Sequence, residues 1–151
     1  MGKRRLSREI TLQFLYSCEC CKNFDKKSLA DFMAYIPEIH RIDEVKSGDT
    51  HFIEFTRTLI EGILDKMSQI DQIIIKNTAN WDFSRLAIID KNILRIAVFE
   101  ILYLDDIPPV VSIDEAVDIA KKYSTPDSGK FVNGILDKIK EDFGNSSPKK
   151  L

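Results

Sequence analysis

Arginines and a tyrosine near the start of the chain have the clearest binding chemistry in this sequence. Three arginines precede Tyr16: Arg4, Arg5 and Arg8. A rotation of 100° per residue places Arg5, Leu12 and Tyr16 on the side of a first helix that faces away from its apolar face. Exposed arginines form bidentate contacts with phosphate, and an exposed aromatic ring can stack on an unpaired base. This pattern predicts an RNA contact; a charged N-terminus beside a surface tyrosine is the alternative.

A second cluster with related chemistry lies in residues 127–131, which read DSGKF. Phe131 occupies one edge of the apolar arc of its helix, where a ring can be half exposed. Lys130 and Asn133 lie beyond that edge. Core packing is the ordinary role of such a ring, and base contact is the second interpretation.

The chain lacks the usual sequence patterns of enzymes and metal sites. It has no glycine-rich phosphate loop, no Gly-x-Ser-x-Gly elbow and no His-Glu-x-x-His pattern. The three cysteines lie too close together to pair readily, and the two histidines are not in a ligand spacing. Cys18 and Cys21 are predicted to be small core residues on the apolar side of their helix. We therefore expect no catalytic residue, metal ligand or cofactor.

Composition indicates one globular domain. The chain has 151 residues, of which 44% are hydrophobic and 30% charged, and its net charge is −2. No apolar run approaches the ~18 residues that span a bilayer, and no secretory h-region follows the basic start, so we expect a cytoplasmic protein without membrane contact. Residues 96–120 contain six acidic residues and no Lys or Arg. They either form ordinary solvated surface or receive a basic protein.

Helical periodicity dominates the first half of the chain. It predicts a first helix over residues 7–22 and a short second helix over 28–36 that stops before Pro37. Residues 38–50 are polar and indicate a mobile loop. A longer helix is predicted to begin near His51. A separate helix should follow it, ending near Asn77 and carrying the apolar residues Ile70, Ile73 and Ile74.

The second half centres on residues 86–104, which are apolar almost all round, with Arg95 on the narrow polar side. Such a helix is buried by others. Glu100 falls among its apolar residues and needs a partner, for which Lys121 and backbone N–H groups at a neighbouring helix start are candidates. Ser112-x-x-Glu115 indicates a capping box that opens the next helix. A last helix is predicted over 128–143, which gives an all-α protein of about seven helices.

Four segments of the chain, in the same order, resemble the NusB family of bacterial transcription antitermination factors. Residues 127–138 (DSGKFVNGILDK) resemble the signature that closes the family, and residues 4–16 resemble its arginine-rich first helix. Residues 93–101 (ILRIAVFEI) resemble its central helix, and residues 107–121 its proline loop with the following helix. The resemblance spans about residues 3–143, nearly the whole chain.

This resemblance implies two packed helical halves in one NusB-like domain over residues 1–143, with a flexible tail at 144–151. It also implies binding of the boxA element of nascent ribosomal RNA, as a single strand, together with the ribosomal protein NusE. That pair would act indirectly on the transcribing RNA polymerase complex and support ribosomal RNA transcription and maturation. The implied RNA-binding residues are Arg4, Arg5, Arg8, Gln13, Tyr16, Asp127, Lys130 and Phe131.

One departure from the family pattern favours an alternative. Leu6 occupies a position that can be a third consecutive arginine in relatives, which is also compatible with a protein-only interaction scaffold that has the same fold and little RNA binding. A related helical domain is fused to ribosomal RNA cytosine methyltransferases, but 151 residues leave no room for that enzyme.

Overall fold

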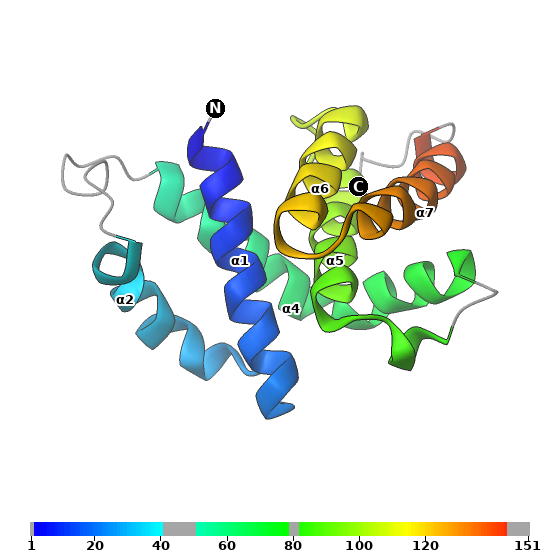
Figure 1. Cartoon of the computed structure of the whole chain (residues 1–151). Helices are drawn as coiled ribbons and strands as arrows, with labels where there is room; N and C mark the ends of the chain where they lie inside the picture. The colour runs from blue at the N-terminus through cyan, green and yellow to red at the C-terminus, as the bar shows by residue number, and fades with distance from the viewer. Residues whose placement is uncertain (1, 41–50, 79–81, 145–151) are drawn as a thin grey trace. The chain divides into compact units, whose positions relative to one another are not determined.

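The computed structural model describes residues 2–40, 51–78 and 82–144, and within them it contains helices and no strand (Figure 1). The predicted all-α class is confirmed. Two short 3-10 helices, η1 (Lys26–Ser28) and η2 (Phe83–Arg85), accompany the α-helices. The described residues form six α-helices: α1 (Gly2–Cys21), α2 (Leu29–His40), α4 (His51–Asn77), α5 (Ile88–Tyr103), α6 (Pro109–Tyr123) and α7 (Pro126–Gly144).

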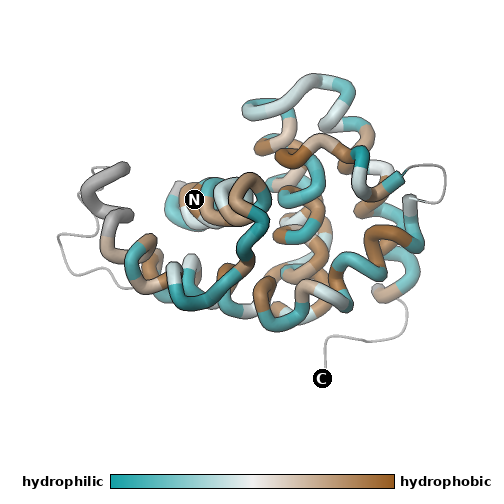
Figure 2. The backbone as a smooth tube through the Cα atoms, turned by 90° about the horizontal axis from the view of Figure 1, so that it is seen from below, coloured by the Kyte–Doolittle hydropathy of each residue, from teal (hydrophilic) through white to brown (hydrophobic). Residues whose placement is uncertain are grey.

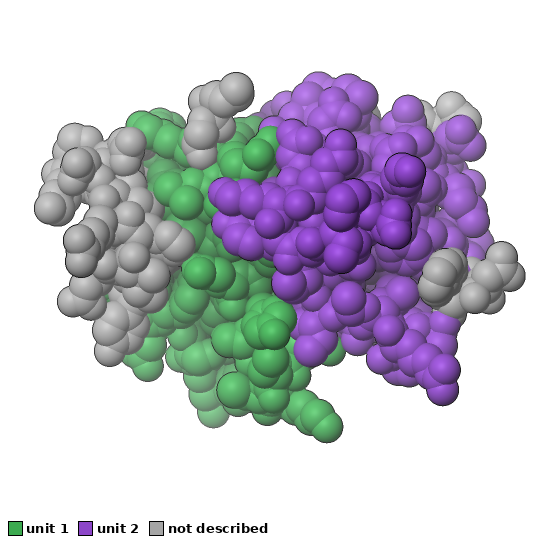
Figure 3. Space-filling model, in the orientation of Figure 1, with its two compact units in different colours: residues 1–65 green, residues 66–151 purple. Residues whose placement is uncertain are grey.

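The chain divides into two compact units, residues 1–65 and 66–151 (Figure 3). The first contains α1, α2 and the beginning of α4, and the second contains the rest of α4 with α5, α6 and α7. The division therefore falls inside one helix. In both units hydrophobic and hydrophilic residues are interspersed along the helices, as expected for amphipathic helices (Figure 2).

Helix α1 has the apolar face that its spacing predicts. Ile10, Phe14 and Leu15 are buried, and the ring of Phe14 lies 5.0 Å from that of Phe32 in α2. The helix ends where Lys22 adopts a φ of 55°. This left-handed conformation lets the N–H of Asn23 donate to the carbonyl of Cys18 at 2.9 Å, a common way to close a helix.

Two predictions for side chains of α1 are wrong. Leu12, expected opposite the apolar face, is only 6% exposed, and Cys21, expected in the core, is exposed. Because α1 contacts both α2 and α4, it buries more than one narrow stripe. Cys21 is the last residue of the helix, where the chain turns away. Cys18 is buried as predicted, and burial raises the pKa of its thiol to about 11.

The boundaries of α2 and α4 also differ from the prediction. Helix α2 continues through Pro37, which removes a single backbone donor, so residues 38–40 of the predicted loop are helical. Residues 41–50 of that loop lie outside the described residues. The two helices expected between His51 and Asn77 are one continuous helix, α4, because its apolar positions keep their three- and four-residue spacing throughout.

Helix α5 is the centre of the second unit. It packs against α6 and α7, which also pack against each other. Every residue from Asp90 to Leu102 is buried. The predicted burial of this segment is confirmed.

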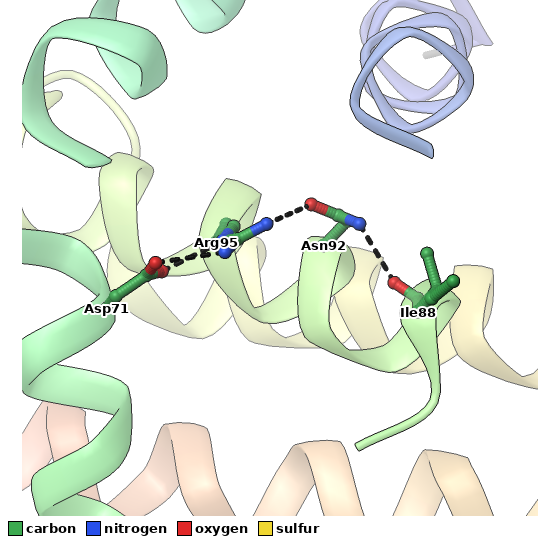
Figure 4. Close-up of polar contacts among 4 residues, drawn as sticks. All are labelled: Asp71, Ile88, Asn92 and Arg95. Atoms are coloured by element: carbon green, nitrogen blue, oxygen red, sulfur yellow. Dashed lines mark hydrogen bonds and ion pairs between the residues drawn. The ribbon is translucent and has the colours of Figure 1, made fainter. Parts of the chain in front are cut away.

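The polar side chains of α5 are buried with it, so Arg95 does not mark a solvent-facing side. Arg95 is 4% exposed, and its Nε and Nη2 donate to the two carboxylate oxygens of Asp71 in α4 at 2.8 and 2.9 Å (Figure 4). Its Nη1 donates to Asn92 Oδ1 at 2.8 Å, and Asn92 Nδ2 donates to the carbonyl of Ile88 at 2.9 Å. This bidentate pair gives the buried guanidinium a matched counter-charge.

Glu100 has a partner that the sequence did not indicate. Ser112 Oγ donates to Glu100 Oε1 at 2.7 Å, and both residues are buried. The predicted capping box at Ser112 is wrong, because α6 begins earlier, with Pro108 as its N-cap and Pro109 in its first turn. Proline is suited to the first position of a helix, so Ser112 lies inside the helix and turns toward α5.

We expect Asp71→Ala to destabilise the second unit by about 3 kcal/mol, because it leaves the buried Arg95 guanidinium without its bidentate partner. The measurement is the urea dependence of helical circular dichroism. Asp65→Ala is the matched control: Asp65 lies on the same helix but its ion pair with Lys26 is exposed, so its loss should cost no more than about 1 kcal/mol. Equal stability of the two variants would contradict the buried ion pair.

Candidate nucleic-acid interface

Five of the predicted site residues lie on α1, in the first unit. Arg4, Gln13 and Tyr16 are exposed, and 43% of the Tyr16 surface is accessible. Arg5 is half-buried. Arg5 and Tyr16 are about three helical turns apart on one side of α1, so a guanidinium and an exposed ring lie along the same helix face. The sequence predicts this shared face, although Leu12, which was expected on the same face, is buried.

Arg8 differs from the expectation of an exposed cation, because only 4% of it is accessible. Its guanidinium carbon lies 5.7 Å from the centre of the Phe55 ring in α4, and that of Arg4 lies 4.5 Å from the same ring. Both distances are within the range of a cation–π interaction. No local spacing signal in the sequence relates Phe55, in α4, to the arginines at the start of α1.

The start of α1 is joined to the start of α4 beside this ring. Ser7 Oγ donates to the carbonyl of Phe52 at 3.2 Å, in a buried contact. A cavity of about 240 Å³ opens next to it, lined by Lys3, Arg4, Ser7, His51, Phe52, Glu54, Phe55 and Thr58. The surroundings of Arg4 are therefore both cationic and aromatic.

The other three predicted residues lie at the start of α7, in the second unit. Asp127 and Lys130 are exposed and Phe131 is half-buried, as expected for the edge of an apolar arc. Asp127 lies in the first turn, where a negative charge is favourable to the helix dipole. Thr125 Oγ1 accepts from the N–H of Ser128 at 3.1 Å and so caps this turn.

Ser128 connects this segment to the buried helix α5. Its Oγ donates to Asp90 Oδ2 at 2.9 Å and lies 2.9 Å from Ser124 Oγ. Asp90 Oδ1 is buried and has no hydrogen-bond partner among the described residues. A methyl group at Gly129 would stand 3.0 Å from Cγ of Lys121, so α6 and α7 approach closely here. Sequence reasoning missed Asp90, which it counted only as part of an apolar helix.

The described residues contain no group of three or more His, Cys, Asp or Glu side chains that could hold a metal ion. None of their helices combines the length and apolar character needed to cross a membrane. The predicted site residues themselves are mainly cationic and aromatic, which is the chemistry that suits phosphates and unpaired bases.

Comparison with known proteins gives consistent matches. The model of the NusB family matches residues 5–141. Relatives named transcription antitermination protein NusB include one from Thermodesulfovibrio yellowstonii, 46% identical over 139 residues and 91% of each chain. Another, from Desulfosudis oleivorans, is 37% identical over 97% of this chain and 90% of its own length.

Solved structures give the same result. NusB from T. maritima is 38% identical, with a TM-score of 0.76 over 92% of this chain and 91% of that chain. A complex of the antitermination factors NusB and NusE with double-stranded RNA contains a chain 25% identical, with a TM-score of 0.79 over 95% of this chain and 99% of its own. With the family model covering most of its length and relatives above 30% identity spanning nearly all of it, this chain belongs to the NusB family.

Proposed function

We propose that this protein is an RNA-binding transcription antitermination factor. It binds the boxA element of nascent ribosomal RNA together with the ribosomal protein NusE, and it supports ribosomal RNA transcription and maturation. The observation that carries the proposal is the similarity, over 95% of the chain, to a structure of NusB and NusE in complex with double-stranded RNA. The protein acts by binding, in the cytoplasm, rather than by catalysis.

The proposed RNA contacts divide by chemistry. Arginines 4, 5 and 8 supply positive charge for phosphates, with the exposed Arg4 best placed for direct contact. Tyr16 and Phe131 supply ring faces for unpaired bases. Gln13, Asp127 and Lys130 are exposed, lie within four residues of those aromatic residues in the sequence, and supply hydrogen bonds. This division is supported by the exposure of Tyr16 and by the half-buried position of Phe131.

The arginine and aromatic contacts should separate under mutation. Arg4→Ala should weaken binding of all RNAs similarly. It should also reduce the slope of log affinity against log salt concentration by the amount expected for about one phosphate contact or less. Tyr16→Leu and Phe131→Leu should each cost roughly 1–3 kcal/mol of boxA binding and lose discrimination from a scrambled strand, with the salt dependence nearly unchanged. The measurement is fluorescence anisotropy of labelled single strands with NusE present, at several salt concentrations.

Leucine keeps apolar bulk at the half-buried Phe131, and unfolding midpoints of all variants control for loss of structure. A double-stranded boxA competitor tests whether unpaired bases are required. Wild-type discrimination in both leucine variants would refute base stacking. Absence of RNA binding by the wild type, with a normal NusE complex, would instead support the protein-only scaffold.

We also expect a one-to-one complex with NusE. The acidic residues of 96–120, of which Asp105, Asp106, Asp114 and Asp118 are exposed, suit a basic ribosomal protein. Gel filtration with light scattering should give one peak with the summed mass of both proteins. Two separate peaks at micromolar concentrations in moderate salt would contradict the proposed partnership.

A further inference from the structure

Phe55 lies at the point where the cationic end of α1 meets α4. Its ring is half-buried, with the Arg4 guanidinium carbon 4.5 Å and the Arg8 guanidinium carbon 5.7 Å from its centre. The ring is held in place locally. Ser7 Oγ donates to the carbonyl of Phe52 at 3.2 Å, and Thr56 Oγ1 donates to the same carbonyl at 2.9 Å. The hydrogen bond that joins α1 to α4 therefore lies less than one helical turn from Phe55, and it holds the ring close to α1.

The two arginines at this ring differ in exposure. Arg8 is 4% exposed, whereas Arg4 is exposed. Only Arg4 can meet a macromolecule without rearrangement of the helix. Stacking uses the flat face of a guanidinium, and its N–H groups lie at the edge, so one side chain can stack on a ring and contact a phosphate at the same time.

The charges point to an anionic ligand. Arg4 and Arg8 place two guanidinium groups within cation–π distance of one ring, which concentrates positive charge at this end of α1. A phosphate placed at the outer edge of Arg4 is attracted to both cations. Fixing Arg4 in advance also reduces the side-chain entropy that is lost when the phosphate binds.

We propose that Phe55 is a positioning residue for RNA binding: it holds the Arg4 guanidinium over its ring so that Arg4 meets a backbone phosphate in a fixed orientation. Arg8 supports the same ring from the buried side of the contact. This inference rests on the proposed function and adds to it a residue, on α4, outside the predicted RNA site.

A double-mutant cycle on RNA affinity tests this role, with the NusE complex and boxA single strand. Phe55→Leu should weaken binding about threefold to tenfold in the wild-type background, because the ring face is lost while apolar bulk and both charges remain. In an Arg4→Ala background the same change should cost less than about twofold, because Arg4 is the group through which the ring acts. Equal losses in the two backgrounds would overturn the proposal, since a general structural defect adds independently.

Three further variants make the test specific. Phe32→Leu is the matched control: Phe32 is a half-buried phenylalanine of the same unit whose ring packs against Phe14, and its replacement should leave RNA affinity within about twofold of wild type. Phe55→Tyr keeps the ring face and should retain wild-type affinity. Replacing Phe55 with pentafluorophenylalanine keeps the ring shape but removes the negative face of the ring. This variant should weaken RNA binding about threefold to tenfold, and its result does not depend on whether leucine disturbs folding.

The outcomes separate this inference from the proposed function. Strong RNA binding by the wild-type complex, with unchanged affinity for the pentafluorophenyl and leucine variants, overturns the positioning role alone. Failure of the wild-type complex to bind boxA RNA overturns both. Loss of affinity at Phe55 that depends on Arg4, with NusE binding intact, supports the positioning role.

Discussion

The burial of α5 from Asp90 to Leu102 is the constraint on which the second unit depends. A helix with water on one side can carry charges at no cost, but α5 is buried from Asp90 to Leu102 and three of its side chains there are Asp90, Arg95 and Glu100. Each buried charge or dipole must be matched, because an unmatched one costs several kcal/mol. Partners come from three different helices: Asp71 of α4 for Arg95, Ser112 of α6 for Glu100, and Ser128 of α7 for one oxygen of Asp90, whose Oδ1 has no partner among the described residues.

These polar contacts determine register in a way that apolar packing alone does not. Hydrophobic side chains tolerate small displacements, whereas hydrogen bonds weaken quickly with distance and angle. The Asp90–Ser128 contact has a direct consequence for the proposed RNA site. It fixes the first turn of α7, which carries Asp127 and is followed directly by Lys130 and Phe131. The geometry of that surface is thus set from inside the core, by a carboxylate that no RNA reaches.

The sequence predicted what periodicity determines and missed what depends on tertiary partners. The burial of α5, the apolar face of α1 and the half-buried edge position of Phe131 all follow from a 100° rotation and the distribution of apolar residues. Periodicity indicates which side of a helix is buried but not which residue lies opposite. Arg95 and Asp71 are 24 residues apart, and Ser128 and Asp90 are 38 apart.

The same limit explains the errors at individual residues. Ser112 and Glu115 match a capping pattern, but proline at the start of α6 begins the helix one turn earlier and leaves Ser112 free to face Glu100. Helical rotation places Arg8 beside the face that carries Arg5 and Tyr16, which predicts an exposed cation. Its burial depends on Phe55, which is far along the chain and belongs to another helix. Long-range pairs of this kind leave no local signal.

The charge distribution bears on how a protein with a net charge of −2 can bind RNA. Most of its surface does not attract phosphate, so the electrostatic term rests on a few arginines at one end of α1. Such a small set supplies limited affinity by itself, and it loses part of that if the side chains must be ordered on binding. Preorganisation over an aromatic ring removes some of this loss. Under the proposed function, a basic partner would add a second set of cations to the same RNA, and linked contacts bind far more tightly than either set alone. Under the proposed function, the RNA affinity therefore depends on NusE because few cations of this chain contact RNA.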